Sequence, residues 1–224
     1  MKIEVILRNP DFNPERPLTP DNQQYNVFVN DIGQGQLLEC NLSPVWVLDV
    51  TSSHIFPDSR KMLNNISDRG YIPFERENDS PKASRLYNFY GALRFAIMRS
   101  GSAHGIAYEI SSEIADTWVE YFSENFECFD SLDEFSDFFV PKALLMTKDL
   151  VGKRYYEIKD TKEFDLEGIF ESGNCSQYCS FNKPMFRIPE ILSNYAKHLF
   201  APEKPPRKVV PMVEKMMRGS QNAG

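Results

Sequence analysis

Hydrophobic and polar positions alternate along the first third of the chain. Apolar residues recur at every second position in residues 2–8 and 25–29, and residues 45–50 form a nearly continuous apolar run. Alternation of period two predicts strands with one buried face, and a short apolar run predicts a central strand. The turn at 31–35 followed by residues 36–42 predicts a hairpin. We therefore expect the chain to begin with a mostly antiparallel sheet.

The spacing then becomes helical. Residues 58–69 predict a short helix that ends at Gly70. Residues 82–99 predict the main core helix, because Leu86, Phe89, Tyr90, Leu93 and Ile97 follow the spacing of one helical face. Residues 153–159 predict a strand that carries Tyr155 and Tyr156. Residues 189–199 predict a last helix that begins at Pro189.

These elements predict an α+β fold with an N-terminal, mostly antiparallel sheet, packed helices and an extended C-terminal tail. We expect residues 1–81 to be the β-rich part and residues 82–200 to be the mainly helical part of the same globular domain. Residues 201–224 contain a proline-rich linker and a short methionine-containing tail helix. The length of 224 residues is enough to bury a sizeable core.

Charge is distributed very unevenly. The segment from Ser100 to Pro141 holds ten carboxylates and no lysine or arginine, whereas the whole chain has a formal net charge of −7. The rest of the chain is therefore slightly positive, and this excess lies in the last 24 residues. A concentration of one sign in one segment indicates recognition of an oppositely charged surface more than it indicates catalysis.

The acidic segment, 112–139, predicts two helices. Ser112 is the expected N-cap of the first, and the pattern that starts at Ser131 is a capping box for the second. At 100° per residue, Ile114, Trp118, Tyr121 and Phe122 share one face of the first helix, and the carboxylates line the other. The predicted acidic face comprises Glu113, Asp116, Glu120, Glu124, Glu127, Asp130, Asp133, Glu134 and Asp137.

Carboxylates one helical turn apart repel each other by about 0.2–0.5 kcal/mol per pair, and anions near a helix C-terminus are unfavourable. A helix selected for stability alone would mix signs. The leading interpretation is a non-enzymatic protein-binding module, of the inhibitor or immunity type, whose acidic face mimics phosphates against a basic partner such as a nucleic-acid-binding protein. Two alternatives remain: a face kept acidic for solubility, and a face that binds the basic tail of the same chain.

The tail suggests a second function. Met212, Val213, Met216 and Met217 would lie on one side of a short helix after the proline linker, and methionine surfaces adapt to partners. The chain would then be a structural subunit of a larger protein or nucleoprotein assembly, docked through this tail. An ordinary frayed terminus is the alternative.

Enzymatic chemistry has weak support in the residue pattern. Cys40, Asp49 and His54 lie close along the chain, and Cys40 or His104 in a cleft would define a small cysteine/histidine-dependent hydrolase. Cys175 and Cys179 lack the second ligand pair that structural zinc requires. We therefore predict no catalytic residues, no metal and no cofactor.

Composition limits the location and the class of partner. No apolar run approaches the roughly 20 residues that span a bilayer, and four scattered cysteines do not form a disulfide framework. We expect a cytoplasmic protein that does not bind membranes. A sequence pI near 5.1 makes direct nucleic-acid binding by the body of the domain unfavourable.

Overall fold

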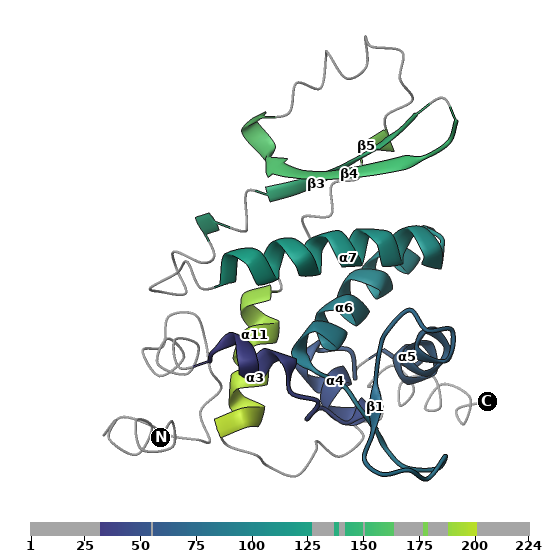
Figure 1. The fold of residues 1–224 in the computed structure, drawn as a ribbon, viewed down its shortest axis with the longest axis vertical. Helices are drawn as coiled ribbons and strands as arrows, with labels where there is room; N and C mark the ends of the chain where they lie inside the picture. Colours follow the sequence, from purple (N-terminus) through teal and green to yellow (C-terminus); the bar gives the residue numbers. More distant parts are fainter. Residues whose placement is uncertain are drawn as a thin grey trace, which may run out of the picture.

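The computed structural model describes residues 32–54, 56–126, 137–138, 142–149, 151–163, 177–178 and 188–200. Within these ranges helices and small antiparallel sheets are combined, so the α+β class is confirmed (Figure 1). No described helix is both long and apolar enough to cross a membrane. The strands expected at 2–8 and 25–29 and the tail from 201 lie outside the described residues, and the boundaries at 81 and 200 stay predictions.

The helical body is built around α6 (Phe89–Ala103). Helix α7 (Tyr108–Asn125) packs along it, and α11 (Ile188–Phe200) crosses both α6 and the short helix α4 (Pro44–Val50) (Figure 1). Helix α5 (Ser59–Asp68) closes the body beside α4 and α6. The largest side chains buried between these helices are aromatic: Trp118, Tyr87, Tyr195, Phe89, Phe95 and Phe122. Burial of these side chains holds the helices together. Full burial of one aliphatic or phenylalanine side chain stabilises a fold by about 1.5–3 kcal/mol.

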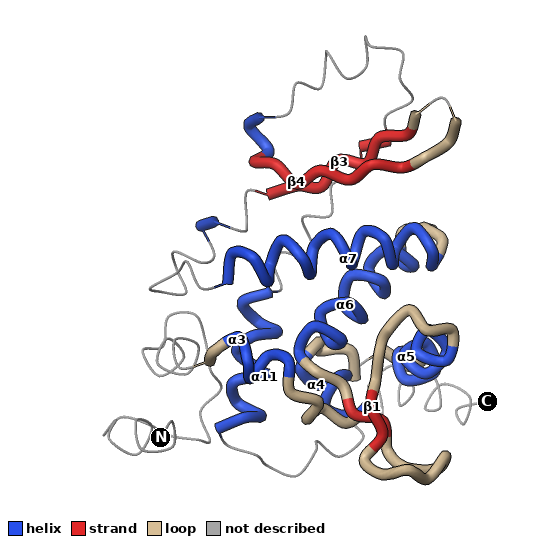
Figure 2. Tube along the Cα trace, viewed as in Figure 1, coloured by secondary structure: helices blue, strands red, loops and turns tan. Residues whose placement is uncertain are grey.

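Two antiparallel sheets complete the described fold (Figure 2). The smaller pairs β1 (Glu75–Arg76) with β2 (Arg85–Leu86). The larger has the strand order β4–β3–β5, formed by β4 (Arg154–Asp160), β3 (Lys142–Lys148) and β5 (Gln177–Tyr178). It lies on the side of α7 away from α6, so α7 is a layer between the helical body and the sheet (Figure 1).

The expected hairpin at 36–42 and strand at 45–50 are wrong, because the structure places helices there. Residues Gln34–Leu38 form α3, whose first turn is closed when the Gly33 amide donates to the Gln36 side chain at 3.1 Å. The run from Pro44 to Val50 forms α4, with Pro44 at a first-turn position. Proline there favours a helix start, and burial of Val47 and Val50 against α11 and α6 outweighs their β propensity.

Four other predictions are confirmed, the core helix only in part. Helix α5 ends one residue before Arg69, and Gly70 follows with φ 78°, a left-handed conformation that glycine adopts without strain. The core helix starts at Phe89 rather than 82, because Asn88 caps it by accepting from the Gly91 amide at 2.9 Å. The expectation that Leu86 lies on its apolar face is wrong, since Leu86 belongs to β2. The strand predicted at 153–159 is β4, and the last helix is α11.

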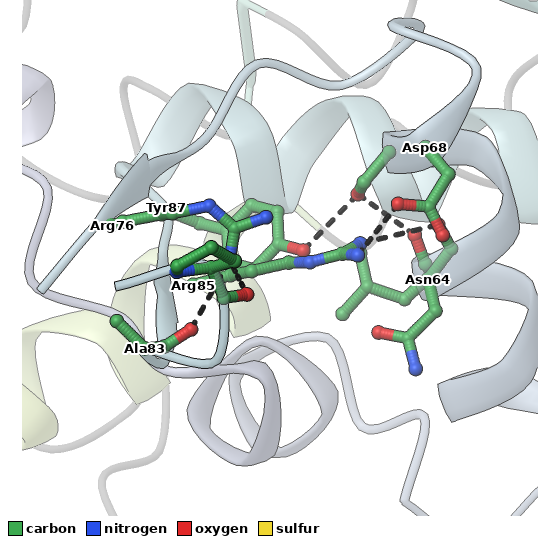
Figure 3. A network of polar contacts seen from close by, with 9 residues as sticks. Asn64, Asp68, Arg76, Ala83, Arg85 and Tyr87 are labelled. Carbon is green, nitrogen blue, oxygen red and sulfur yellow. Dashed lines mark hydrogen bonds and ion pairs between the residues drawn. The ribbon is translucent and has the colours of Figure 1, made fainter. Parts of the chain in front are cut away.

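The small sheet is tied to α5 by an arginine. Arg85 donates to Asp68 at 2.6 Å and to the Asn64 carbonyl at 3.3 Å (Figure 3). Its guanidinium also lies over the Phe74 ring. Beside it the Tyr87 hydroxyl meets Ser67 at 3.1 Å. These contacts place the start of α6 against α5.

Helices α6 and α7 approach each other closely at Gly101. A Cβ atom added to Gly101 would lie 2.4 Å from Ser111 Oγ and 3.1 Å from Ser111 Cβ. Ser111 is 1% exposed, so it has little room to move. The close approach therefore requires glycine at this position.

We expect Gly101→Ala to lower the free energy of unfolding by about 1–3 kcal/mol, because overpacking a tight contact displaces both helices. Gly35→Ala is the matched control: Gly35 is also helical, and a Cβ there would meet nothing within 4 Å. Removing its flexibility should stabilise the protein by about 0.5–1 kcal/mol. Urea denaturation measures both, and equal effects of the two substitutions would contradict the close α6–α7 approach.

Candidate functional site: the acidic face of helix α7

Helix α7 starts earlier than predicted. Its N-cap is Ala107, so the expectation that Ser112 caps it is wrong. Ser112 lies inside the helix and is buried, with its hydroxyl accepting from Arg94 at 3.1 Å. The predicted apolar side is confirmed, since Ile114, Trp118 and Phe122 are buried. Its packing fixes the rotation of α7 and therefore the direction of its carboxylates.

The first of these carboxylates, Glu113, points toward the sheet. Arg154 at the start of β4 donates to it through Nε at 2.7 Å and Nη2 at 2.5 Å, and the Tyr156 hydroxyl donates to the same carboxylate. The hydrogen bonds from Arg154 hold the pKa of Glu113 below its ordinary value, against the opposing effect of burial. Burial and the adjacent Glu113 raise the pKa of Tyr156. Glu113 therefore joins α7 to β4.

Asp116 is paired with an arginine of the neighbouring helix. Arg94 in α6 donates to Asp116 and also to the Tyr71 carbonyl, at 3.0 Å from Nε and 2.7 Å from Nη2. Only 15% of the Arg94 side chain is exposed, whereas 56% of Asp116 is exposed. A guanidinium this deeply placed needs a carboxylate partner, and Asp116 supplies it. Glu113 and Asp116 therefore each have an arginine partner within the chain, and their place in a binding face stays a prediction.

The last two turns of α7 are different. Glu120 and Glu124 are exposed, and no described lysine or arginine forms an ion pair with either. They lie one helical turn apart, about 6 Å along the axis. Glu109 in the first turn is also exposed. Among the α7 carboxylates of the predicted face, Glu120 and Glu124 are the two without an ion pair in the described chain, and we call this pair the acidic step.

Neutral groups cover the C-terminal carbonyls of α7. Gln34 of α3 donates from Nε2 to the Ser123 carbonyl at 2.7 Å, and Asn125 donates to the Tyr121 carbonyl at 2.8 Å. No basic residue lies in the last turn. A helix C-terminus favours cations, so the acidic step occupies a position where its charges are electrostatically unfavourable.

The remaining predicted site residues are only partly described. Asp137 is exposed. The second acidic helix is otherwise outside the described residues, as are Glu127, Asp130, Asp133 and Glu134. The tail residues Met212, Val213, Met216 and Met217 lie outside them too.

Sequence reasoning missed the two arginines that pair with α7. One signal was available: Arg94 lies between Leu93 and Phe95 in the middle of an apolar helix, where a charge requires a partner. The carboxylate-rich segment begins a few residues after Arg94 in the sequence, so a partner for it was close at hand. Arg154 carried no comparable signal, because its pairing with Glu113 depends on how the sheet packs.

The residues considered for catalysis are arranged unfavourably for a thiolate. Burial and the nearby carboxylate of Glu75 raise the pKa of the Cys40 thiol, which disfavours the nucleophilic form. His54 Nδ1 lies 3.7 Å from Asp49. His104 is exposed at the end of α6, next to the Ser100 carbonyl at 2.7 Å.

Metal chemistry has no support in the described chain either. No group of three or more His, Cys, Asp or Glu residues there is arranged to hold a metal ion. Cys175 and Cys179 lie outside the described residues.

Comparison with known proteins gives no assignment: no protein-family model and no curated protein sequence matches the chain.

We expect Glu113→Gln to lower stability by about 1 kcal/mol at pH 7, a value kept small because 40% of the Glu113 side chain is exposed. The pKa of Glu113 is lowered by folding, so its contribution is complete above the unfolded value of about 4.3 and is lost as the pH falls further, through the folded pKa. Urea denaturation at pH 7 and near pH 3 measures this.

Glu120→Gln is the control for this prediction, since Glu120 lies on the same helix face without a described basic partner. The change in unfolding free energy caused by Glu120→Gln should be similar at pH 7 and near pH 3, whereas the change caused by Glu113→Gln should shrink at the lower pH. An equal pH dependence in the two variants would contradict the proposed contribution of Arg154 and Tyr156.

Proposed function

We propose that this chain is a non-enzymatic protein-binding module whose acidic step, Glu120 and Glu124, binds a basic surface on a partner protein. The observation that carries the proposal is the contrast along α7. Glu113 and Asp116 each have an arginine partner, whereas the acidic step is exposed without one among the described residues.

The electrostatic cost of these carboxylates within the helix supports this proposal. Two carboxylates at i,i+4 repel each other, and the helix dipole disfavours both. The chain places Gln34 and Asn125 at the last carbonyls, where a lysine would be more stabilising. Residues that are unfavourable for the isolated protein and remain exposed are typical of a surface used for binding, where a basic partner supplies the missing charges.

An inhibitor or immunity protein of a nucleic-acid-acting enzyme is the partner relationship that this charge suits best. In that case the carboxylates occupy the place of phosphates in a basic groove. The class is assigned by analogy from charge. Docking as an assembly subunit through Met212, Val213, Met216 and Met217 stays a prediction, because those residues lie outside the described chain.

We expect the double variant Glu120→Lys/Glu124→Lys to lose partner binding while it becomes more stable. Lysine near a helix C-terminus is favourable by about 0.3–1 kcal/mol per charge, so the loss cannot come from unfolding. The measurements are affinity capture from the native source with purified bait at low and at high salt, followed by urea denaturation of each bait. Raising the salt to about 0.5 M should release the captured partner from the wild-type bait.

Glu77→Lys/Asp79→Lys is the matched control. It makes the same change in net charge at two exposed positions in the loop after β1. It should retain the partner. Retention of the same partner by Glu120→Lys/Glu124→Lys would contradict the proposal. Capture that does not change with salt concentration would contradict it too.

A further inference from the structure

Strand β4 is an outer strand of its sheet. Among the described strands it pairs only with β3, so its other edge carries no described partner. The hairpin that joins β3 to β4 sets which groups face that edge. The Asp149 amide donates to the Lys153 carbonyl at 3.0 Å, and the Gly152 amide donates to the Asp149 carbonyl at 3.0 Å, with Gly152 at φ 89°.

Hydrogen-bonded pairs in an antiparallel ladder alternate, so the pairing of Asp149 with Lys153 fixes the pattern along β4. Tyr155, Glu157 and Lys159 direct their backbone groups to β3. The N–H and C=O groups of the alternate residues point to the free edge, and these are Arg154, Tyr156, Ile158 and Asp160. Such an edge is a template for one more strand.

The free edge lies beside the acidic face. On one flank of α7, Glu113 bonds to Arg154 and Tyr156 of β4. On the other flank, Tyr121 stacks on Phe138, whose ring lies 4.8 Å from Lys142 Nζ of β3. The flank of α7 that carries the carboxylates is therefore turned toward the open side of β4.

Helix α7 and strand β4 also run in the same direction. Glu113, early in α7, meets Arg154, the first residue of β4. Tyr121, two turns later, stacks on Phe138, whose ring lies under Nζ of Lys142, and Lys142 pairs with Asp160, the last residue of β4. The acidic step is thus level with the last residues of β4.

A second copy of the chain fits this edge poorly. Two β4 strands paired across a two-fold axis would lie about 4.8 Å apart. Each α7 packs against its own β4, so the two helices would approach far closer than the 8–10 Å that packed helices need. Their carboxylates would also face each other. A basic segment that has no helix packed under it avoids both the steric clash and the charge repulsion, so it fits this edge better than a second copy does.

We propose that the partner is bound through an extended basic segment that adds to β4 as an antiparallel or parallel edge strand, with two basic side chains on alternate residues contacting Glu120 and Glu124. This inference rests on the function proposed above. The spacing supports it: residues i and i+2 of a strand are about 6.6 Å apart, and the acidic step spans about 6 Å. Adjacent basic residues would point to opposite faces of the sheet, so only one would reach α7.

The test uses the full-length chain and synthetic threonine/valine peptides of about nine residues with two central lysines. In one peptide the lysines are separated by one residue, and in the other they are adjacent. Because only the first can meet both carboxylates, we expect it to bind at least about fivefold more tightly at low salt. Glu120→Lys/Glu124→Lys should remove that preference, and Glu77→Lys/Asp79→Lys should keep it.

Backbone pairing is tested with N-methylated forms of the better peptide. Methyl groups on one set of alternate residues block the edge that faces β4, and methyl groups on the other set leave it intact. One form should lose binding and the other should keep it. In the bound protein, amide hydrogen exchange should slow at Tyr156 and Ile158, while Tyr155 and Glu157, already bonded to β3, report no change.

Three results would overturn the inference. Equal binding of both N-methylated forms, with NMR shifts confined to α7, would remove the edge strand and leave the acidic-surface function intact. Absence of binding by either lysine peptide at low salt would also reject the edge-strand inference. The proposed function would then be tested by the partner-capture experiment alone. Slowed exchange at Tyr156 and Ile158 in a concentration-dependent dimer without peptide would assign the edge to a second copy.

Discussion

The packing of α7 between α6 and β4 is the constraint on which the rest of the described structure depends. On its inner side the helix buries Trp118 and Phe122 against the helical body. On its outer side Glu113 holds Arg154 and Tyr156 of the sheet. One helix therefore connects two layers by two kinds of force, apolar burial toward the core and charge-assisted hydrogen bonds toward the sheet.

This position explains why the carboxylates of one helix have different environments. Near its N-terminal half, α7 is flanked by Arg94 of α6 and Arg154 of β4, so Asp116 and Glu113 are partly neutralised. Its last turns extend past both arginines. There the chain provides amide donors such as Gln34 and no described cation, and Glu120 and Glu124 remain exposed without an ion pair in the described chain. The carboxylates therefore look alike in the sequence, but in the structure those in the first half of α7 are paired and those in its last turns are not.

The same geometry relates the charged helix to the strand above it. An exposed strand edge alone is unselective, because every peptide carries the same backbone groups. Carboxylates alone are equally unselective among basic surfaces. Side by side, the edge sets the direction and register of a segment and the carboxylates set the spacing of its charges. A site with both features can distinguish one basic segment from another, which neither feature achieves by itself.

The sequence by itself determined the elements whose burial is periodic over several turns. The apolar side of α7 and the body of α6 follow from local spacing, because a periodic face has one way to meet the core. Helices α5 and α11 were marked in the sequence by Gly70 and Pro189 at their ends. Short segments were decided by tertiary structure: the run at 45–50 suits a strand or a buried helix, and packing on α11 and α6 selects the helix. The pairing of the carboxylates was also decided there. Arg94 lies 22 positions from Asp116 and Arg154 lies 41 positions from Glu113, so only the folded chain brings each arginine to its carboxylate.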